Sequence, residues 1–207
     1  MRLAPHSLSL GVSTQVSSDP WLQPWMPLIL ERAGTGPVLE IGCGTGQDTL
    51  TLADAGARVV AFDQSPQAVA KARERAPQAE ITCQDARDPF PSLGLRIGVV
   101  IASLSLHYFS WSETRSLFAR VHDQLCHGGL FLCRLNSTND HNHGASGHPQ
   151  IEPNYYLVDG LPKRFFDRAS IDQLFAHGWR ILSMQELATD KYARPKVLWE
   201  LVVERDA

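Results

Sequence analysis

The stretch Val38-Leu39-Glu40-Ile41-Gly42-Cys43-Gly44-Thr45-Gly46-Gln47 decides the fold of this chain. Its first four residues are mostly apolar, which indicates a fully buried strand. Three glycines follow at every second position, so the chain can turn tightly there and a ligand can approach the backbone. Residues 48–55 then predict a helix, which Gly56 ends. A strand, a glycine loop and a helix N-terminus in this order indicate a nucleotide-binding turn.

The spacing of the glycines distinguishes two kinds of ligand. In the dinucleotide fingerprint, glycines stand at positions one, three and six, which here are Gly42, Gly44 and Gln47; the third glycine comes one residue early, at Gly46. Glu40 would repel a pyrophosphate, but it suits a ligand that carries an amino group and a sulfonium. The stretch resembles motif I of the class I S-adenosylmethionine (SAM)-dependent methyltransferases. A structural glycine turn and a degenerate NAD site are the alternatives.

Two acidic residues extend this pattern. Residues 57–63 predict a second strand, and its last residue, Asp63, lies 63 − 42 = 21 residues after Gly42. A carboxylate at that point of a nucleotide-binding fold meets the ribose hydroxyls, although a helix-capping or surface role is the alternative. Asp85 follows a third predicted strand, and the resemblance implies that it accepts a hydrogen bond from the adenine amino group. Asp88 is the other candidate for that role and suits a turn before a proline.

The fourth predicted strand, residues 97–103, leads into residues 104–109, which resemble motif IV of the same family. There the strand tip passes under the methionine part of the cofactor. His107 is a candidate proton acceptor or substrate contact, and the alternative is a packed, hydrogen-bonded histidine. The resemblance implies SAM as the cofactor, held by Glu40, Gly42, Cys43, Gly44, Thr45, Gly46, Asp63, Gln64, Asp85, Ala86, Ser103 and Leu104.

Residues 137–163 interrupt the regular pattern and are rich in Asn, His, Gly and Pro. A loop of this length in a compact domain is usually functional or disordered, so we expect a mobile, polar, lid-like insertion over the active site. Its three histidines have no carboxylate or cysteine at a spacing that would complete a metal site. We therefore predict no metal, at His141, His143, His148 or elsewhere.

A helix over residues 168–177 and strands over 181–186 and 196–204 complete the predicted order. Strand six should run parallel to strands four and five, so the loop after it should open at the edge of the sheet where ligands bind. Cations there could hold an anionic acceptor while aromatic side chains exclude water; the alternative is that they are solvated surface residues. The predicted substrate contacts are His107, Tyr108, Tyr155, Tyr156, Arg164, Tyr192 and Arg194.

Composition indicates one soluble globular domain. The chain has 207 residues, 43% hydrophobic and 20% charged, with a net charge of −3, so neither a membrane span nor a broad nucleic-acid surface is expected. We expect a flexible leader at residues 1–18 without the features of a signal peptide, a single domain at 19–207, and a cytoplasmic monomer or homodimer. Trp21, Trp25 and Ile29 mark one apolar face of a helix capped by Asp19; such a helix packs on the core and, in the family, often also covers the cofactor.

The resemblance covers residues 20–205 and implies an α/β, Rossmann-like, doubly wound sheet of seven strands whose last strand is antiparallel. It also implies methyl transfer to a small molecule, such as a thiol, a chalcogen oxyanion or another anionic nucleophile. A SAM-binding sensor or subunit without catalysis, and an NAD-dependent oxidoreductase, are the other classes considered. The C-terminal half is similar in layout to tellurite-resistance and thiopurine-type methyltransferases. Thr189-Asp190 stand near the place where tellurite-resistance enzymes carry a His-Arg pair.

Overall fold

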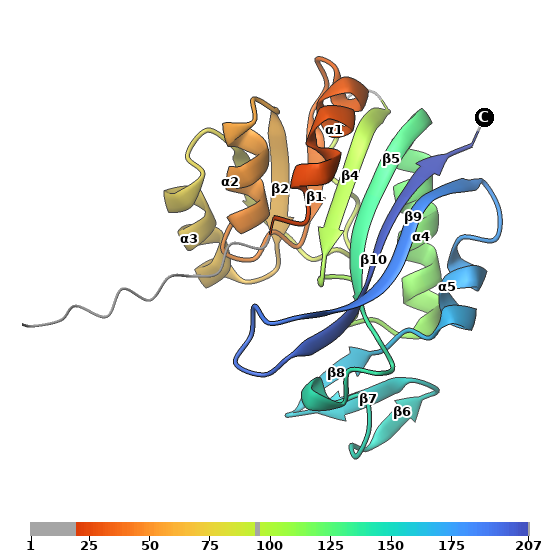
Figure 1. The fold of residues 1–207 in the computed structure, drawn as a ribbon. Coiled ribbons are helices and arrows are strands. Elements are labelled where there is room, and N and C mark those ends of the chain that lie inside the picture. The colour runs from red at the N-terminus through yellow and green to blue at the C-terminus, as the bar shows by residue number, and fades with distance from the viewer. Residues whose placement is uncertain (1–19, 94–95, 207) are drawn as a thin grey trace, which may run out of the picture.

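The computed structural model describes residues 20–93 and 96–206 and shows a twisted main sheet with helices on both faces (Figure 1). The expected leader at residues 1–18 and the expected helix cap at Asp19 lie outside the described residues. In chain order the elements are η1 Gln23–Trp25, α1 Met26–Ala33, β1 Val38–Ile41, α2 Gln47–Asp54, β2 Val59–Asp63, α3 Pro66–Arg75, β3 Glu80–Cys83, β4 Ile97–Ser103, α4 Trp111–Gln124, β5 Leu125–Asn136, η2 His141–His143, β6 Gln150–Glu152, β7 Tyr155–Val158, β8 Leu161–Arg164, α5 Arg168–Leu174, β9 Trp179–Thr189 and β10 Lys196–Arg205.

The main sheet has seven strands in the order β3-β2-β1-β4-β5-β10-β9. Neighbours from β3 to β5 pair in parallel, whereas β10 is antiparallel to both β5 and β9. The last strand is therefore antiparallel, as predicted, and β9 runs in the direction of β4 and β5. The order reverses between β1 and β4, and in sheets of this kind ligands bind beyond the carboxyl ends of the strands at that point.

Two hydrophobic clusters hold the helices to the two faces. One joins α4 and α5 to the sheet through residues such as Phe118 and Phe175, and the other joins α1, α2 and α3 through residues such as Ile29 and Leu52. Successive residues of β4 alternate between the clusters, as the two-residue period of a strand requires. This buries both faces of the central strands and explains their nearly continuous apolar sequence.

The predicted elements of residues 38–124 agree closely with the observed ones. Strands β1 and β4 have the predicted bounds, and a capping box between Ser110 and Glu113 opens α4. One boundary was wrong. The N-terminal helix was expected directly after Asp19, but helical structure begins with η1. Strand β5 begins at Leu125, which pairs with Ile97 across a register irregularity.

Residues 137–164, called the inserted segment below, are regular rather than irregular. After η2 they form a three-stranded antiparallel sheet, β6-β7-β8, that lies beside the main sheet (Figure 1). The prediction of a structureless loop was wrong because the strands are only three or four residues long and are joined by tight turns. Asp159 and Gly160, both with positive φ (51° and 78°), form the turn between β7 and β8.

No helix in the described part of the chain is both long and apolar enough to cross a membrane.

Candidate cofactor site

The glycine loop after β1 is fixed by contacts that leave no room for a larger residue at Gly42. The Gly42 amide donates to the carbonyl oxygen of Phe62 at 2.8 Å, and the Ser105 hydroxyl donates to the carbonyl oxygen of Ile41 at 2.5 Å. Gly42 has a φ of +72°, and a Cβ added there would lie 2.3 Å from the Cβ of Ser105. The ends of β1 and β4 therefore approach each other closely because this position carries no side chain.

Gly44 is different, because a Cβ added there would meet open space. Its φ is +54° and no atom lies within 4 Å of the added Cβ. Gly44 lines both of the cavities that border the loop. The loop thus forms an open backbone cradle at Gly44, of the kind that a bound nucleotide or nucleoside fills.

The Asp63 carboxylate ties this cradle to the end of β2. Its Oδ2 accepts a hydrogen bond from the Gly44 amide at 2.9 Å, and its Oδ1 accepts one from the Ser65 amide, also at 2.9 Å. A carboxylate has about four lone-pair sites, so each oxygen of Asp63 keeps one for a further donor. The predicted ribose partner therefore also shapes the glycine loop, which the sequence did not reveal.

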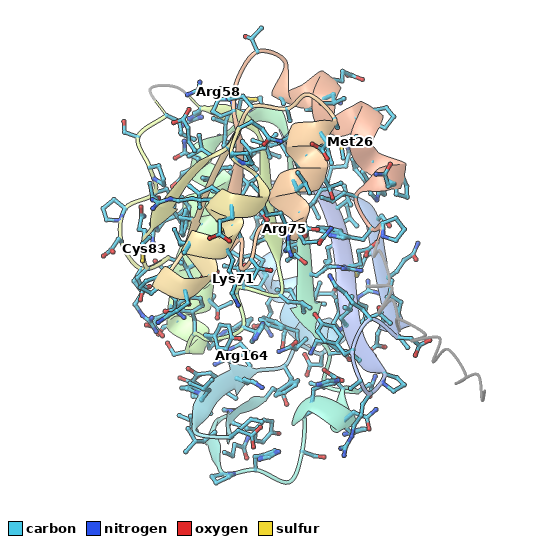
Figure 2. The ribbon with its side chains drawn as sticks, turned by 90° about the vertical axis from the view of Figure 1, so that its left-hand side faces the viewer. Met26, Arg58, Lys71, Arg75, Cys83 and Arg164 are labelled. Atoms are coloured by element: carbon cyan, nitrogen blue, oxygen red, sulfur yellow. The ribbon has the colours of Figure 1, made fainter. Side chains whose placement is uncertain are left out.

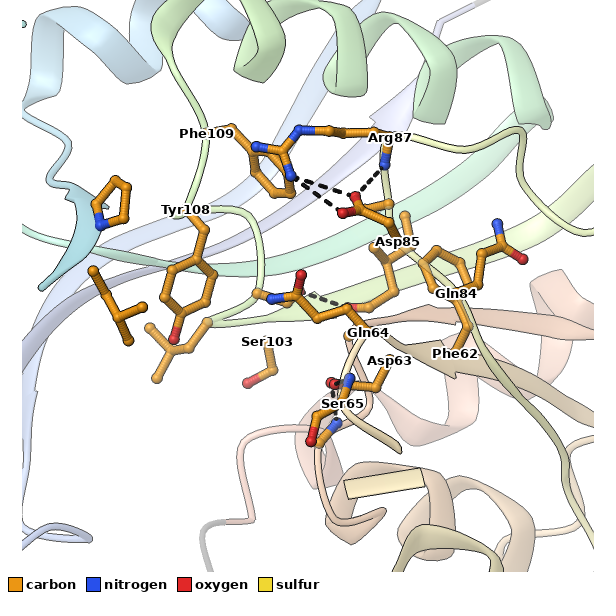
Figure 3. A pocket seen from close by; sticks show the side chains of 18 of the residues that line it. Phe62, Asp63, Gln64, Ser65, Gln84, Asp85, Arg87, Ser103, Tyr108 and Phe109 are labelled. Carbon is orange, nitrogen blue, oxygen red and sulfur yellow. Dashed lines mark hydrogen bonds and ion pairs between the residues drawn. The ribbon is translucent and has the colours of Figure 1, made fainter. Parts of the chain in front are cut away.

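The larger cavity, about 600 Å³, lies beyond the carboxyl ends of β1, β2 and β4 (Figure 3). Among its lining residues, Asp85 accepts a hydrogen bond from the Arg87 amide at 2.8 Å, and the Arg87 guanidinium lies 3.3 Å from Asp85 Oδ2. Arg87 Nε also donates to Glu113 at 2.8 Å, and this bond is the largest cause that lowers the pKa of Glu113 to about 2. Its lining comprises Ile41, Gly42, Gly44, Phe62, Asp63, Gln64, Ser65, Gln84, Asp85, Ala86, Arg87, Ser103, Leu104, Ser105, Tyr108, Phe109, Leu161, Pro162 and Tyr192.

The smaller cavity, about 250 Å³, is strongly charged. Glu40 is only 2% exposed, and its carboxylate accepts a hydrogen bond from the Thr49 hydroxyl at 2.6 Å. Burial, and then the negative charge of Asp48, raise the pKa of Glu40 to about 8. Burial, and then Glu40, likewise raise the pKa of Cys43 to about 12. Its lining comprises Glu40, Gly42, Cys43, Gly44, Thr45, Gln47, Asp48, Ser103, Leu104, Arg134, Lys191 and Tyr192.

The segment before α1 covers one edge of this smaller cavity. Trp21 is buried, and its Nε1 donates to Asp48 Oδ2 at 3.0 Å. The Arg134 guanidinium lies 4.8 Å from the centroid of a Trp21 ring and pairs with Glu200 at 3.0 Å. Trp21 thus belongs to the core, as one reading of the sequence predicted, and also contacts two residues of the cavity wall.

Most of the predicted cofactor residues gather at these two cavities. Gly42, Gly44, Ser103 and Leu104 line both of them, together with Tyr192. Leu104 has a φ of +53°, a strained conformation for a residue with a side chain, and such strain is concentrated at functional sites. Gly46 lines neither cavity; a Cβ there would lie 2.9 Å from the Cα of Ala72, so this glycine lets α2 and α3 pack closely.

His107 lies beside the site rather than in it. It is 5% exposed, lines neither cavity, and its ring centroid lies 4.1 Å from that of Tyr108. Burial, followed by the charges of Lys196 and Lys163, lowers the pKa of His107 to about 3. Its Nδ1 is buried and has no hydrogen-bond partner among the described residues. The imidazole is therefore neutral and a very weak base.

The structure does not bring Arg164 to the cavities. It is buried where the inserted segment meets the main domain (Figure 2). Its guanidinium donates to the Phe109 carbonyl at 3.0 Å, to the Pro153 carbonyl at 3.2 Å and to the Glu152 carboxylate, and lies over the Tyr155 ring at 4.7 Å. These contacts account for its three nitrogens, and Arg164 joins two parts of the fold.

Of the remaining predicted substrate residues, some lie at the larger cavity and others lie away from both cavities. Tyr108 lines the larger cavity, and burial raises the pKa of its hydroxyl. The Tyr155 hydroxyl donates to the Tyr108 carbonyl at 3.0 Å and so supports that wall from behind. Tyr156 of the inserted segment packs near Phe165, and Arg194 is exposed in the β9–β10 loop. Neither lines a cavity.

Several lining residues were missed by sequence reasoning. Arg134 carried a signal, since a lone arginine in the apolar run of β5 must find a polar partner. Asp48 also carried one, as an acidic residue in the first turn of a helix. Leu161 and Pro162 reach the larger cavity only because the inserted segment folds back as a sheet, and nothing in their local sequence indicates this.

Known proteins resemble the chain in both sequence and fold. Residues 38–129 match the family described as "Methyltransferase domain". Uncharacterized methyltransferase sll0829 of Synechocystis sp. is 36% identical over 107 residues, 50% of this chain and 50% of that protein. Trans-aconitate 2-methyltransferase of Delftia acidovorans is 33% identical over 101 residues, 47% of this chain and 37% of that protein. The chain thus spans half or less of the length of these relatives.

Among solved structures, an S-adenosylmethionine-dependent methyltransferase from Clostridium acetobutylicum superposes with a TM-score of 0.69 at 16% identity, over 90% of this chain and 91% of that one. The strand order and the antiparallel last strand agree with this likeness. The chain therefore has the fold of the class I SAM-dependent methyltransferases.

Proposed function

We propose that this protein transfers the methyl group of SAM to a small-molecule acceptor. The observation that carries the proposal is the open cradle at Gly44, which Asp63 holds in place and which lines two adjoining cavities. A nucleoside joined to an amino acid needs two compartments of different polarity side by side, and the residues around the loop provide them.

The chemistry of the lining fits the two halves of this cofactor. In the larger cavity, Asp63 would accept hydrogen bonds from the ribose hydroxyls, and Asp85 would accept one from the adenine amino group. In the smaller cavity, Asp48 would attract the positive charges of the methionyl part, and Arg134 would pair with its carboxylate. A cationic amino group bound beside Glu40 would favour the ionised form of that carboxyl. When bound, SAM supplies an electrophilic methyl group on a sulfonium, so the protein's part is to bind, orient and exclude water.

The acceptor must bring its own nucleophile. His107 lies outside both cavities with a lowered pKa, and Tyr108 has a raised one, so neither is a strong base at neutral pH. The carboxylates among the described lining residues are assigned above to the cofactor. An acceptor that is already ionised or has a soft lone pair, such as a thiol, a chalcogen oxyanion or a carboxylate, needs no base. Trans-aconitate, named in the Delftia relative, is an anion of this kind.

The wall available to the acceptor is more apolar than the sequence suggested. Tyr108 and Phe109 lie on one side of the larger cavity, and Leu161 and Pro162 enter it from β8. Lys196, at the start of β10, pairs with buried Asp140 at 2.8 Å. We therefore propose a small acceptor with a nucleophilic group on an apolar body. The likeness to tellurite-resistance and thiopurine-type enzymes stays a prediction.

The test is a turnover screen that detects the loss of the methyl group. The protein is incubated with SAM and separate thiol, selenium, tellurium, arsenic, carboxylate and phenol acceptors, and S-adenosylhomocysteine is quantified by mass spectrometry. Product that forms only with an acceptor supports the proposal. SAM binding without product from any class would favour a sensor or a subunit, and binding of NAD without SAM would favour an oxidoreductase.

A further inference from the structure

One aromatic residue stands where the two cavities meet. Five residues line both cavities; four of them, Gly42, Gly44, Ser103 and Leu104, come from the ends of β1 and β4. The fifth is Tyr192, from the loop between β9 and β10. The two cavities therefore join between the strand ends and this tyrosine.

The proposed function places a positive charge at this junction. If the nucleoside occupies the larger cavity and the methionyl part the smaller one, the sulfonium that connects them lies between the shared residues. Tyr192 is the single aromatic residue among those five. The face of an aromatic ring attracts a cation, and a sulfonium carries little hydration that it would have to lose.

The inserted segment holds the loop of Tyr192 in place. Asn142 donates from its side-chain amide to the Pro195 carbonyl at 2.9 Å, and a ring nitrogen of His143 lies 3.2 Å from the Arg194 carbonyl oxygen. The rings of His143 and Tyr192 meet edge to face with their centroids 5.8 Å apart. The residues of η2 thus contact both the backbone and the aromatic ring of the β9–β10 loop.

We infer that Tyr192 covers the sulfonium of bound SAM and contacts it through its aromatic ring, and that Asn142 and His143 position it there. The inference rests on the proposed function and deepens it. The inserted segment would thus take part in cofactor recognition, because its residues in η2 hold Tyr192 of the β9–β10 loop over the site. Tyr192 is therefore a cofactor contact, whereas Asn142 and His143 are positioning residues.

A comparison of SAM with S-adenosylhomocysteine tests the ring, because the two ligands differ in the methyl group and its positive charge. Calorimetry on the full chain gives the ratio of the two affinities. Tyr192→Leu should lower the preference for SAM over S-adenosylhomocysteine by about 5- to 30-fold, while Tyr192→Phe, which keeps the ring, should stay within about twofold of the wild type. Tyr192 is 39% exposed, so neither change should unfold the protein.

Two further variants complete the experiment. The double variant Asn142→Ala with His143→Ala should shift the ratio in the same direction as Tyr192→Leu, by less. Leu157→Ala, an exposed apolar position on β7 that lines neither cavity, should leave it unchanged. Equal losses for both ligands in Tyr192→Leu, or a ratio that falls in Tyr192→Phe as well, would overturn the inference. A wild-type protein that binds neither ligand would instead refute the proposed function.

Discussion

Residues 38–129 and the inserted segment, residues 137–164, contrast in how they form structure. In the first region, strands, glycine turns and caps each follow from local sequence, and the same region matches the methyltransferase family. In the second, short strands pair with one another and depend on further contacts with distant residues. Local patterns thus encode the half of the fold that holds the candidate cofactor loop, whereas the half that shapes the proposed acceptor side depends on tertiary contacts.

The largest expected effect concerns the junction between the two regions. Arg164→Ala should lower the free energy of unfolding by about 3–5 kcal/mol, because Glu152 loses its charged partner and keeps only the Trp111 amide, and two backbone carbonyls lose a donor. Chemical denaturation measures it. The matched control is Arg168→Ala, an exposed i,i+4 pair with Asp172 that should cost about 0.3–0.5 kcal/mol.

This prediction replaces an earlier expectation from the sequence, in which Arg164 holds an anionic acceptor. A substrate-binding role would raise KM for the acceptor and leave stability unchanged. If Arg164→Ala unfolds at the same denaturant concentration as Arg168→Ala, the inserted segment is not tied to the main domain in the way described.

The second prediction concerns the glycine loop. Asp63→Ala should weaken SAM binding by about 1–3 kcal/mol, because a charged acceptor of hydrogen bonds is lost. It should also lower stability, since the amides of Gly44 and Ser65 lose their partner. Asp63→Asn keeps one acceptor oxygen, so its SAM affinity and its stability should lie between those of the wild type and of Asp63→Ala. Calorimetry and thermal melting measure the two effects, and an unchanged SAM affinity in Asp63→Ala would argue against the assigned ribose contact.

The third prediction concerns the pH dependence of stability, and its effect is the smallest when taken per pH unit. The pKa of Glu40 is raised to about 8 in the folded protein, so the folded state keeps a proton that the unfolded state releases above its usual pKa of 4.5. The contribution of Glu40 to stability should therefore fall as pH rises from about 4.5 to about 8, by at most about 1.4 kcal/mol per pH unit. Glu40→Gln keeps an acceptor for Thr49 and removes this slope.

Unfolding measured at pH 5, 6 and 7 checks the difference between Glu40→Gln and the wild type. The free energy of unfolding of Glu40→Gln, relative to that of the wild type, should increase at each step. A constant difference would mean that Glu40 ionises normally in the folded protein.

The cofactor half could be predicted because its signals are local. The positive φ of Gly42 and the position of Asp63 at the end of β2 follow from a few neighbouring residues. Asp63 was predicted from its spacing after the glycine loop and Asp85 from the family resemblance, and both line the larger cavity. The seven strands and the antiparallel last strand followed from the family resemblance.

The acceptor side could not be predicted in the same way. His107 and Arg164 looked chemically active in the sequence, yet their neutrality and pairing depend on burial by residues that lie far away in the chain. Conversely, Leu161 and Pro162 looked like ordinary loop residues and line the larger cavity. Burial and pairing are tertiary properties, and they decide which polar side chains are free to meet a ligand.

Calorimetric titration of the wild type and of Gly44→Ala with SAM tests the central claim most directly. The substitution strains a position with φ of +54°, so it should lower the free energy of unfolding by about 1–2 kcal/mol. The added methyl group also enters the open space at the loop and fills the cradle. We predict that the wild type binds SAM and not NAD, and that Gly44→Ala stays folded but loses SAM binding. A wild type that ignores SAM, or a folded Gly44→Ala that binds it with unchanged affinity, would contradict the account.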